Sequence, residues 1–186
     1  MINEKLQIQR ILKGDTSAFG HFVDTYQDMA ITIAYRVCGN KQDAEDIVQN
    51  AFVKAFHNLH TFRSDSKFST WFYRIVYNTA ISEIKGTNFN TEFVDYMQME
   101  TDNSYSDWDT IEQIEEKERK ASLSKAMDTL PNDESLLLTL YYLDENSVKD
   151  IVKITGLTEA NVKVKLHRAR KRLGETINQM VRQGEI

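Results

Sequence analysis

The sequence is poor in the residues that mark several protein classes. Its 186 residues include one cysteine and one proline, and no apolar run approaches the roughly 18 residues that a membrane-spanning helix needs. A lone cysteine, Cys38, excludes an intramolecular disulfide and a cysteine-cluster metal site. The N-terminus, MINEKLQIQRILKG, carries charges where a signal peptide has its apolar region. We therefore predict a cytoplasmic protein without redox chemistry.

Sequence motifs of enzymes are also missing. The chain has no phosphate-binding glycine loop, no nucleophile motif and no pair of carboxylates that helical spacing would bring together in a cleft. His57 and His60 are three residues apart and could share one face of a helix, but no further side chain lies at ligand spacing. The sequence predicts no enzyme activity, no cofactor, no metal and no small-molecule substrate.

What the chain does have is helical periodicity. Glycines are few, with seven in the chain, and strand-like alternation is rare, so the fold is predicted to be all-α. Apolar residues recur at helical spacing over 4–38, with a break at Gly14, over 41–59 and over 68–86. The pattern resumes at Ile111, and Pro131 suits the first turn of a further helix.

Charge is distributed unevenly along the chain. The net charge of the whole chain is −5, and residues 91–118 alone contain ten acidic and one basic side chain. This composition is typical of a linker. We therefore predict two small helical domains, 1–90 and 117–186, joined by an acidic flexible linker over 91–116. Because the acidity is local, a pI of about 5.4 does not argue against a nucleic-acid partner.

Residues 147–173 have the pattern of a helix-turn-helix. Ser147 with Asp150, and Thr158 with Glu159, are signals for the start of two helices, and Gly156 lies in the short turn between them. At about 100° per residue, one face of the second helix is apolar. Its predicted packing residues are Val162, Leu166, Ala169 and Leu173.

The second helix of this motif is strongly basic. Residues 158–173 contain six Lys or Arg and one acidic residue, Glu159. A surface helix with solvated cations would have the same composition, but the preceding helix and turn favour DNA binding in the major groove. We expect the first turns to approach bases and the later cations to hold phosphates. The predicted base readers are Thr158, Asn161, Lys163 and Lys165, and the predicted phosphate contacts are Arg168, Arg170 and Arg172.

Aromatic residues are concentrated at the start of the helix predicted over 68–86. Five of them lie between Phe68 and Tyr77. Most such rings belong to a core, and we expect this of Phe68, Trp71 and Ile75. Exposed rings beside cations are, however, typical of single-stranded nucleic-acid binding, because every base offers a face for stacking.

Three stretches together resemble one family. DAEDIVQNAFVKAFHNL (43–59), FSTWFYRIVYNTAISEIK (68–85), and LPNDESLLLTLYYL with the helix-turn-helix (130–173) are similar, in order and spacing, to the conserved segments of bacterial RNA polymerase sigma factors of the extracytoplasmic-function group. After residue 81 the family commonly has an aspartate followed by an arginine pair, whereas this chain has Ser82, Glu83, Ile84, Lys85 and Gly86. The resemblance covers most of the chain.

The resemblance implies a role for each stretch. Helix 43–56 would dock on core RNA polymerase, helix 68–85 would melt and read the minus-10 element beside a base pocket shaped by loop 60–67, and the C-terminal domain would read the minus-35 element. Promoter DNA and an anti-sigma factor, which can be membrane-anchored, would be further partners. The implied polymerase contacts are Asp43, Asp46 and Gln49, and the implied minus-10 contacts are Lys67, Phe72, Tyr73, Arg74, Tyr77 and Asn78.

A second reading stays open at this point. A stand-alone helix-turn-helix regulator, with an N-terminal domain that senses a ligand or dimerises, would share the C-terminal pattern. Such a protein binds duplex DNA without core polymerase. The aromatic stretch around Trp71 favours the sigma-factor reading, because a duplex-only regulator does not need single-strand stacking.

Overall fold

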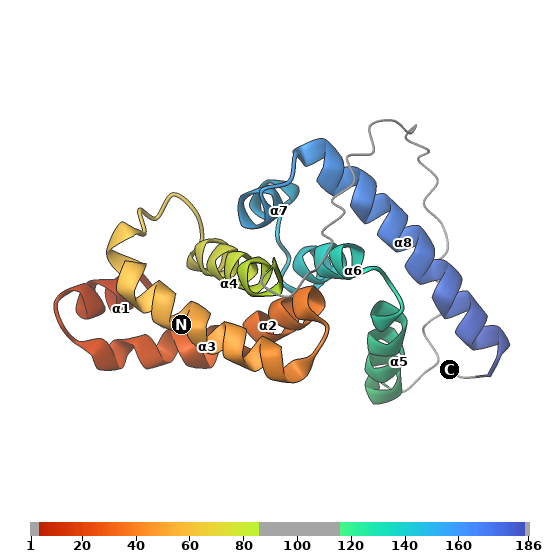
Figure 1. The fold of residues 1–186 in the computed structure, drawn as a ribbon, viewed down its shortest axis with the longest axis horizontal. Coiled ribbons are helices and arrows are strands. Elements are labelled where there is room, and N and C mark those ends of the chain that lie inside the picture. The colour runs from red at the N-terminus through yellow and green to blue at the C-terminus, as the bar shows by residue number, and fades with distance from the viewer. Residues whose placement is uncertain (1–3, 86–115, 185–186) are drawn as a thin grey trace.

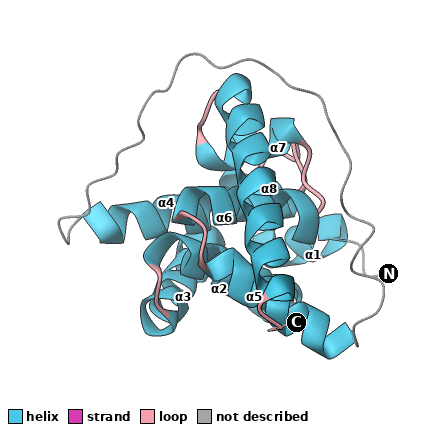
Figure 2. Ribbon diagram, turned by 90° about the vertical axis from the view of Figure 1, so that its right-hand side faces the viewer, coloured by secondary structure: helices cyan, strands magenta, loops and turns pink. Residues whose placement is uncertain are grey.

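The computed structural model describes residues 4–85 and 116–184, and every regular element in these residues is helical (Figure 2). The prediction of an all-α fold is confirmed. The elements of the N-terminal half are α1 (Glu4–Leu12), the 3-10 helix η1 (Thr16–Phe19), α2 (Gly20–Cys38), α3 (Lys41–Asn58), the 3-10 helix η2 (Leu59–Thr61) and α4 (Phe68–Lys85). Those of the C-terminal half are α5 (Glu116–Asp128), α6 (Asn132–Leu138), the π-helical turn η4 (Thr139–Leu143), α7 (Val148–Thr155) and α8 (Glu159–Arg182).

The N-terminal half is a bundle in which α2, α3 and α4 pack against one another (Figure 1). Gly39 ends α2 in the left-handed conformation, with φ of 80°, which glycine adopts without a Cβ clash. Asn40 then caps α3 by accepting a hydrogen bond of 2.8 Å from the backbone N–H of Asp43. The α2–α3 corner is therefore set by two adjacent residues. Fully buried residues of this bundle include Phe22, Ile33, Ala34, Ala44, Ala51, Phe72 and Val76.

The C-terminal half is built around α8, which contacts α5, α6 and α7. Pro131, predicted in the first turn of a helix, is the N-cap of α6. Leu136, Leu137 and Leu140, which follow it, are buried. The helix α6 packs against α8 and runs directly into η4.

The two halves lie against each other. The helix α6 lies between α2 and α8, and α7 lies beside α4 (Figure 1). Buried hydrophobic residues of both halves form one continuous core. The predicted linker, apart from Glu116 at the start of α5, falls outside the described residues, so the domain boundaries stay predictions.

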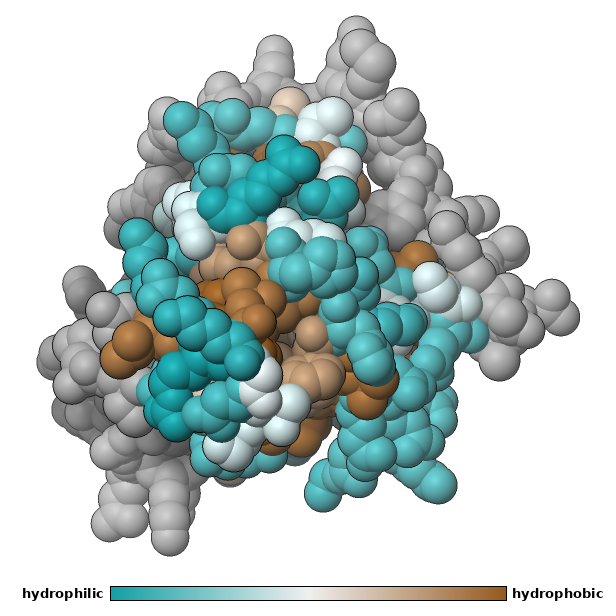
Figure 3. Space-filling view, turned by 90° about the vertical axis from the view of Figure 1, so that its left-hand side faces the viewer, coloured by the Kyte–Doolittle hydropathy of each residue, from teal (hydrophilic) through white to brown (hydrophobic). Residues whose placement is uncertain are grey.

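The end of the molecule at the left of Figure 1 carries exposed hydrophobic residues. Figure 3 views this end and shows a shallow apolar hollow ringed by hydrophilic residues. In the described part of the N-terminal half, the large hydrophobic side chains classed as exposed are Leu6, Leu12 and Val53. Across the described residues, none of the helices is both long and apolar enough to cross a membrane.

Candidate nucleic-acid interface

The helix-turn-helix has the cap geometry that the sequence predicted. The backbone N–H of Asp150 donates to Ser147 Oγ over 3.2 Å, and that of Asn161 donates to Thr158 Oγ1 over 3.2 Å. Between the helices Gly156 has φ of 75° and its N–H bonds to the carbonyl of Val152 at 2.9 Å. Only glycine adopts this left-handed conformation without strain. These caps fix where α7 ends and where α8 begins.

The packed face of α8 agrees with the predicted one. Val162, Leu166, Ala169 and Leu173 are all buried, and Met180 continues the stripe. A helix turns by about 100° per residue, so the buried stripe also fixes where the polar residues of α8 lie. Residues on the opposite face of α8 must point away from the rest of the C-terminal half.

Lys165, Arg170 and Arg172 of α8 contact side chains of other elements of the C-terminal half. Lys165 pairs with Asp133 at 2.5 Å, and Arg172 pairs with Glu134 at 3.0 Å. The two carboxylates come from the first turn of α6, where they also favour the helix dipole. Lys165 and Arg172 therefore lie at the flank of α8 that joins it to α6.

Arg170 lies on the other flank of α8. Its Nε donates to Tyr142 Oη over 2.7 Å, and its guanidinium lies 5.1 Å from the ring centre of Tyr141. Such a cation–π contact adds to the packing of η4 against α8. From the sequence, Lys165, Arg170 and Arg172 were expected to contact DNA. In the structure, each of them has a protein partner.

The outward face of α8 carries a different set. Lys163, His167 and Lys171 are exposed there, and Lys163 forms an ion pair of 2.7 Å with Glu159 one turn earlier. Asn161 and Arg168 are partly exposed. The site list drawn from the sequence omitted His167 and Lys171, although Lys171 is nine residues, or about 180°, from the buried Val162. This angle in the sequence could have predicted that Lys171 faces outward.

On α4 the structure corrects the expected division between core and interface. Phe72, Tyr73 and Tyr77 were expected at the DNA face, but they are 0%, 1% and 7% exposed. Phe72 stacks on Phe52 with ring centres 4.4 Å apart, and burial raises the pKa of Tyr77 to about 12. Rings packed in this way cannot stack on bases.

The phase of α4 explains why these rings are buried. Phe68, Phe72 and Val76 follow a four-residue spacing that faces α2 and α3, and all three are buried. Trp71 and Ile75 were expected in the core, but they lie on the neighbouring stripe and are only half-buried. Phe68 is buried as expected.

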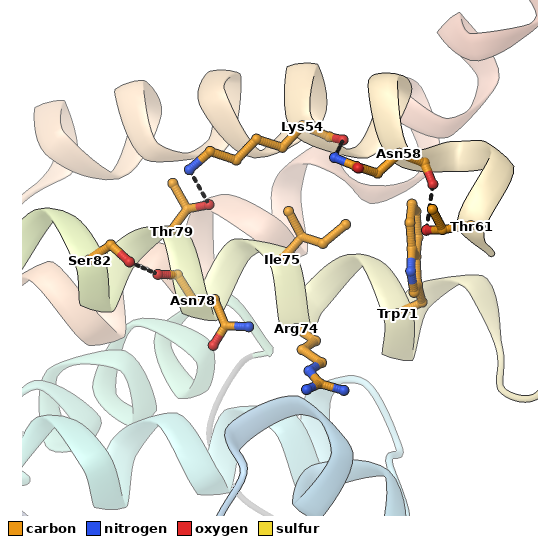
Figure 4. Close-up of a pocket in the computed structure, with 9 residues that line it drawn as sticks. All are labelled: Lys54, Asn58, Thr61, Trp71, Arg74, Ile75, Asn78, Thr79 and Ser82. Carbon is orange, nitrogen blue, oxygen red and sulfur yellow. Dashed lines mark hydrogen bonds between the residues drawn. The ribbon is translucent and has the colours of Figure 1, made fainter.

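A pocket of about 410 Å³ lies between α3 and this neighbouring stripe of α4 (Figure 4). Lys54 Nζ donates to Thr79 Oγ1 over 3.2 Å, and Trp71 stands at one end of the pocket. Arg74 and Asn78 are exposed on α4, and Lys67 precedes that helix. The lining residues are Lys54, Asn58, Thr61, Trp71, Arg74, Ile75, Asn78, Thr79 and Ser82.

A further polar surface lies on the outer face of α3. Asp43, Asp46 and Gln49, the implied polymerase contacts, are exposed. Val53 lies four residues after Gln49 on the same face and is 56% exposed. The sequence analysis did not name it.

Comparisons with known proteins give the family. Residues 22–89 match Sigma-70 region 2, and residues 120–173 match Sigma-70 region 4. The chain is 31% identical to the ECF RNA polymerase sigma factor SigW of Bacillus subtilis (strain 168), over 95% of this chain and 97% of that protein. It is 29% identical to the ECF RNA polymerase sigma-E factor of Escherichia coli (strain K12), over 97% of both chains.

Solved structures agree at the level of the fold. CnrH, in complex with the cytosolic domain of CnrY, superposes with a TM-score of 0.62 at 18% identity, over 94% of this chain and 96% of that chain. RpoE from Bartonella quintana, in complex with the anti-sigma factor NepR, gives 0.63 at 20% identity, over 86% of this chain and 96% of that chain. From the sequence matches, the chain belongs to the extracytoplasmic-function (ECF) sigma factors of bacterial RNA polymerase, which direct promoter-specific transcription initiation.

Proposed function

We propose that this sigma factor docks on core RNA polymerase through α3, reads the minus-35 element as duplex through α8, and reads the minus-10 element as single strand through α4. One observation carries the proposal. Each half has its own polar surface of the required kind, a helix-turn-helix in one half and a pocket between two helices in the other. Duplex and single-stranded DNA make different demands, and the two surfaces match them separately.

For the minus-35 element we assign roles by position on α8. Thr158, Asn161 and Lys163 lie in the first turns, which enter the major groove in a helix-turn-helix. Arg168 and Lys171 lie further along and are placed to hold phosphates. Lys165, Arg170 and Arg172 were first expected to contact DNA directly. Their protein partners support a main role in fixing the tilt of α8 on α6 and η4.

For the minus-10 element we assign the DNA contact to the pocket between α3 and α4, because the aromatic rings first expected there are buried. Trp71 offers a half-exposed aromatic face, and stacking contributes about 1 to 3 kcal/mol per base. Asn78 carries both donors and acceptors for a base edge, while Lys67 and Arg74 supply charge for the backbone. A pocket of about 410 Å³ falls in the ordinary range for small-ligand sites and suits one extruded base.

For polymerase docking we assign Asp46, Gln49 and Val53 of α3, with Asp43 at its start. An exposed apolar side chain beside acidic and amide groups has the composition of a small protein interface, with an apolar centre and a polar rim. The protein itself is proposed to be non-catalytic, since initiation chemistry belongs to the polymerase. We place it in the cytoplasm, where its polymerase partner acts.

An anti-sigma factor is the further partner that we propose. The relatives CnrH and RpoE were solved in complex with CnrY and with the anti-sigma factor NepR. A membrane-anchored inhibitor is the form to test first, by co-purification of the tagged sigma factor from detergent-solubilised membranes. No small-molecule substrate, cofactor or metal is part of the proposed function.

The experiment for the proposed function is transcription with purified components. Core RNA polymerase and the sigma factor are incubated with fragmented genomic DNA, and the 5′ ends of the transcripts are mapped. Starts that depend on both proteins and share two upstream elements support the proposal. DNA binding that is specific without polymerase, together with no new starts, would instead support a stand-alone regulator.

A further inference from the structure

The outward face of α8 is apolar at its centre, between polar flanks. At about 100° per residue, Val164 lies about 170° and Ala160 about 150° from the centre of the buried stripe that starts at Val162. Ala160 is exposed and Val164 is partly exposed. In Figure 1, α8 forms one edge of the molecule, with α5, α6 and α7 on its other side. Two apolar side chains therefore lie on the face that points away from the C-terminal half.

Val164 has no packing role that would explain it. Among the described residues, the partly buried hydrophobic side chains that pack against the core include Leu157 just before α8 and Ile177 toward its end, but not Val164. Valine is β-branched, so it also favours a helix less than alanine does. Since neither packing nor helix propensity favours a valine here, its side chain is placed for a contact outside the chain.

Polar residues flank the apolar pair on both sides. Asn161 lies about 60° round the helix from Val164, and Lys163 lies about 60° from Ala160 in the other direction. Lys163 forms its ion pair of 2.7 Å with Glu159, which lies still further round toward the buried stripe. This pair draws the Lys163 side chain away from Ala160, so the apolar pair stays open to a ligand on that side.

The apolar character is confined to the first two turns of α8. The next residues of the outward face are His167 and Lys171, and both are exposed. In a helix-turn-helix the first turns of the second helix enter the major groove, and neighbouring groups hold phosphates. The apolar pair thus coincides with the turns that would meet base edges. Two small side chains fall far short of the roughly 800 Å² per partner of a stable protein interface, so a protein ligand does not suit them.

The major groove offers one apolar group of matching size, which is the C5-methyl group of thymine. Ala160 and Val164 are four residues apart, a rise of about 6 Å along the helix, which spans one or two base-pair steps of about 3.4 Å. We propose that Ala160 and Val164 select thymine in the minus-35 element by contact with its methyl group. The element then carries thymines, on either strand, one or two steps apart. The inference rests on the proposed role of α8 as the minus-35 reader.

The first experiment removes the methyl group and nothing else. Promoters mapped with core polymerase and the full chain are synthesised with uracil in place of each thymine of the upstream element, one at a time. Binding by the complex of polymerase and sigma factor should weaken about three- to fivefold at the two contacted positions, as expected for one lost methyl contact. It should stay unchanged at other thymines. Unchanged binding at every thymine, or an upstream element without thymine, would overturn the proposal.

Variants of α8 then identify the side chain that reads each methyl group. Val164→Ala should no longer distinguish uracil from thymine at one of the two positions, because the shorter side chain does not reach the methyl group. Ala160→Ser, which brings a hydroxyl to the methyl group, should lose the distinction at the other. Val181→Ala is the matched control, because Val181 is 44% exposed near the end of the same helix, and it should keep the full response. A uracil effect that survives Val164→Ala would assign the methyl group to another residue and contradict the inference.

Stability and promoter function are measured beside binding. Val164→Ala should not lower the melting temperature, because Val164 does not pack against the core and alanine favours a helix. If no polymerase-dependent starts are found, the proposed function fails, and the uracil test is run on duplexes that the full chain selects from a random library. A uracil effect there that is lost in Val164→Ala supports thymine reading by α8. A selection without any preferred duplex removes the inference together with the function.

Discussion

Arg172 of α8 donates a hydrogen bond of 3.0 Å to Glu134 of α6, a residue 38 positions earlier whose side chain is 8% exposed. The second carboxylate oxygen of Glu134 has no hydrogen-bond partner in the described part of the chain. Burial therefore outweighs the arginine and raises the pKa of Glu134 above its ordinary value. Keeping the Glu134 carboxylate charged beside α8 therefore costs desolvation free energy.

The first prediction concerns pH. Because its pKa is raised, Glu134 holds its proton more tightly in the folded protein than in the unfolded chain. Its favourable contribution is complete below the unfolded pKa of about 4.3 and is lost as the pH rises through the folded pKa. The free energy of unfolding of the wild type, relative to Glu134→Gln, should therefore fall between pH 4 and pH 7. Urea unfolding across that range measures it, and a relative rise would show that Arg172 dominates.

The second prediction separates the cations of α8. Lys171 is on the outward face, whereas Arg172 is paired with Glu134. Lys171→Ala should reduce the salt slope of binding to minus-35 duplex by about one, as expected for one lost phosphate contact. Arg172→Ala should change that slope less, while lowering the melting temperature more. Equal slopes for the two variants would contradict the assignment.

The third prediction concerns the aromatic helix. Phe72 is 0% exposed, so Phe72→Ala should lower the free energy of unfolding by about 3 to 5 kcal/mol. Phe72→Leu keeps part of the volume and should lose less. Trp71→Ala, on the pocket, should instead leave most of the stability and reduce permanganate-reactive, melted promoter. A stable Phe72→Ala protein with a melting defect would restore the earlier expectation that this ring meets DNA.

The fourth prediction divides the acidic face of α3. Asp43 accepts a hydrogen bond of 2.6 Å from the side chain of the capping residue Asn40, so Asp43→Ala should cost about 0.5 to 1 kcal/mol of stability. Asp46→Ala and Val53→Ser should leave stability nearly unchanged and weaken binding to core polymerase in a pull-down titration. Undiminished binding by both would place the docking surface elsewhere.

Much of the fold could be predicted from periodicity and caps. The helix-turn-helix was predicted from Ser147, Thr158 and Gly156, and the buried face of α8 was predicted from residue spacing alone. These features depend on residues close together in the chain. Local rules of capping and period are enough for them.

The candidate site was harder because it depends on which neighbours a helix meets. The sequence places Phe72 and Trp71 side by side, and only the packing of α4 on α2 and α3 decides that the first is core and the second lines a pocket. The pairing of Lys165 with Asp133, 32 residues away, is likewise a tertiary contact. Charge counting along one helix could not reveal it.

The most direct test of the central claim is transcription-start mapping with purified core RNA polymerase and the wild-type protein, compared with an Asn78→Ala variant. Asn78 is exposed on α4 and lines the proposed base pocket. We predict starts that require both proteins, with two shared upstream elements, and a variant that binds polymerase normally but yields few open complexes. Specific DNA binding with no polymerase-dependent starts, or a variant that opens promoters as well as the wild type, would contradict the account.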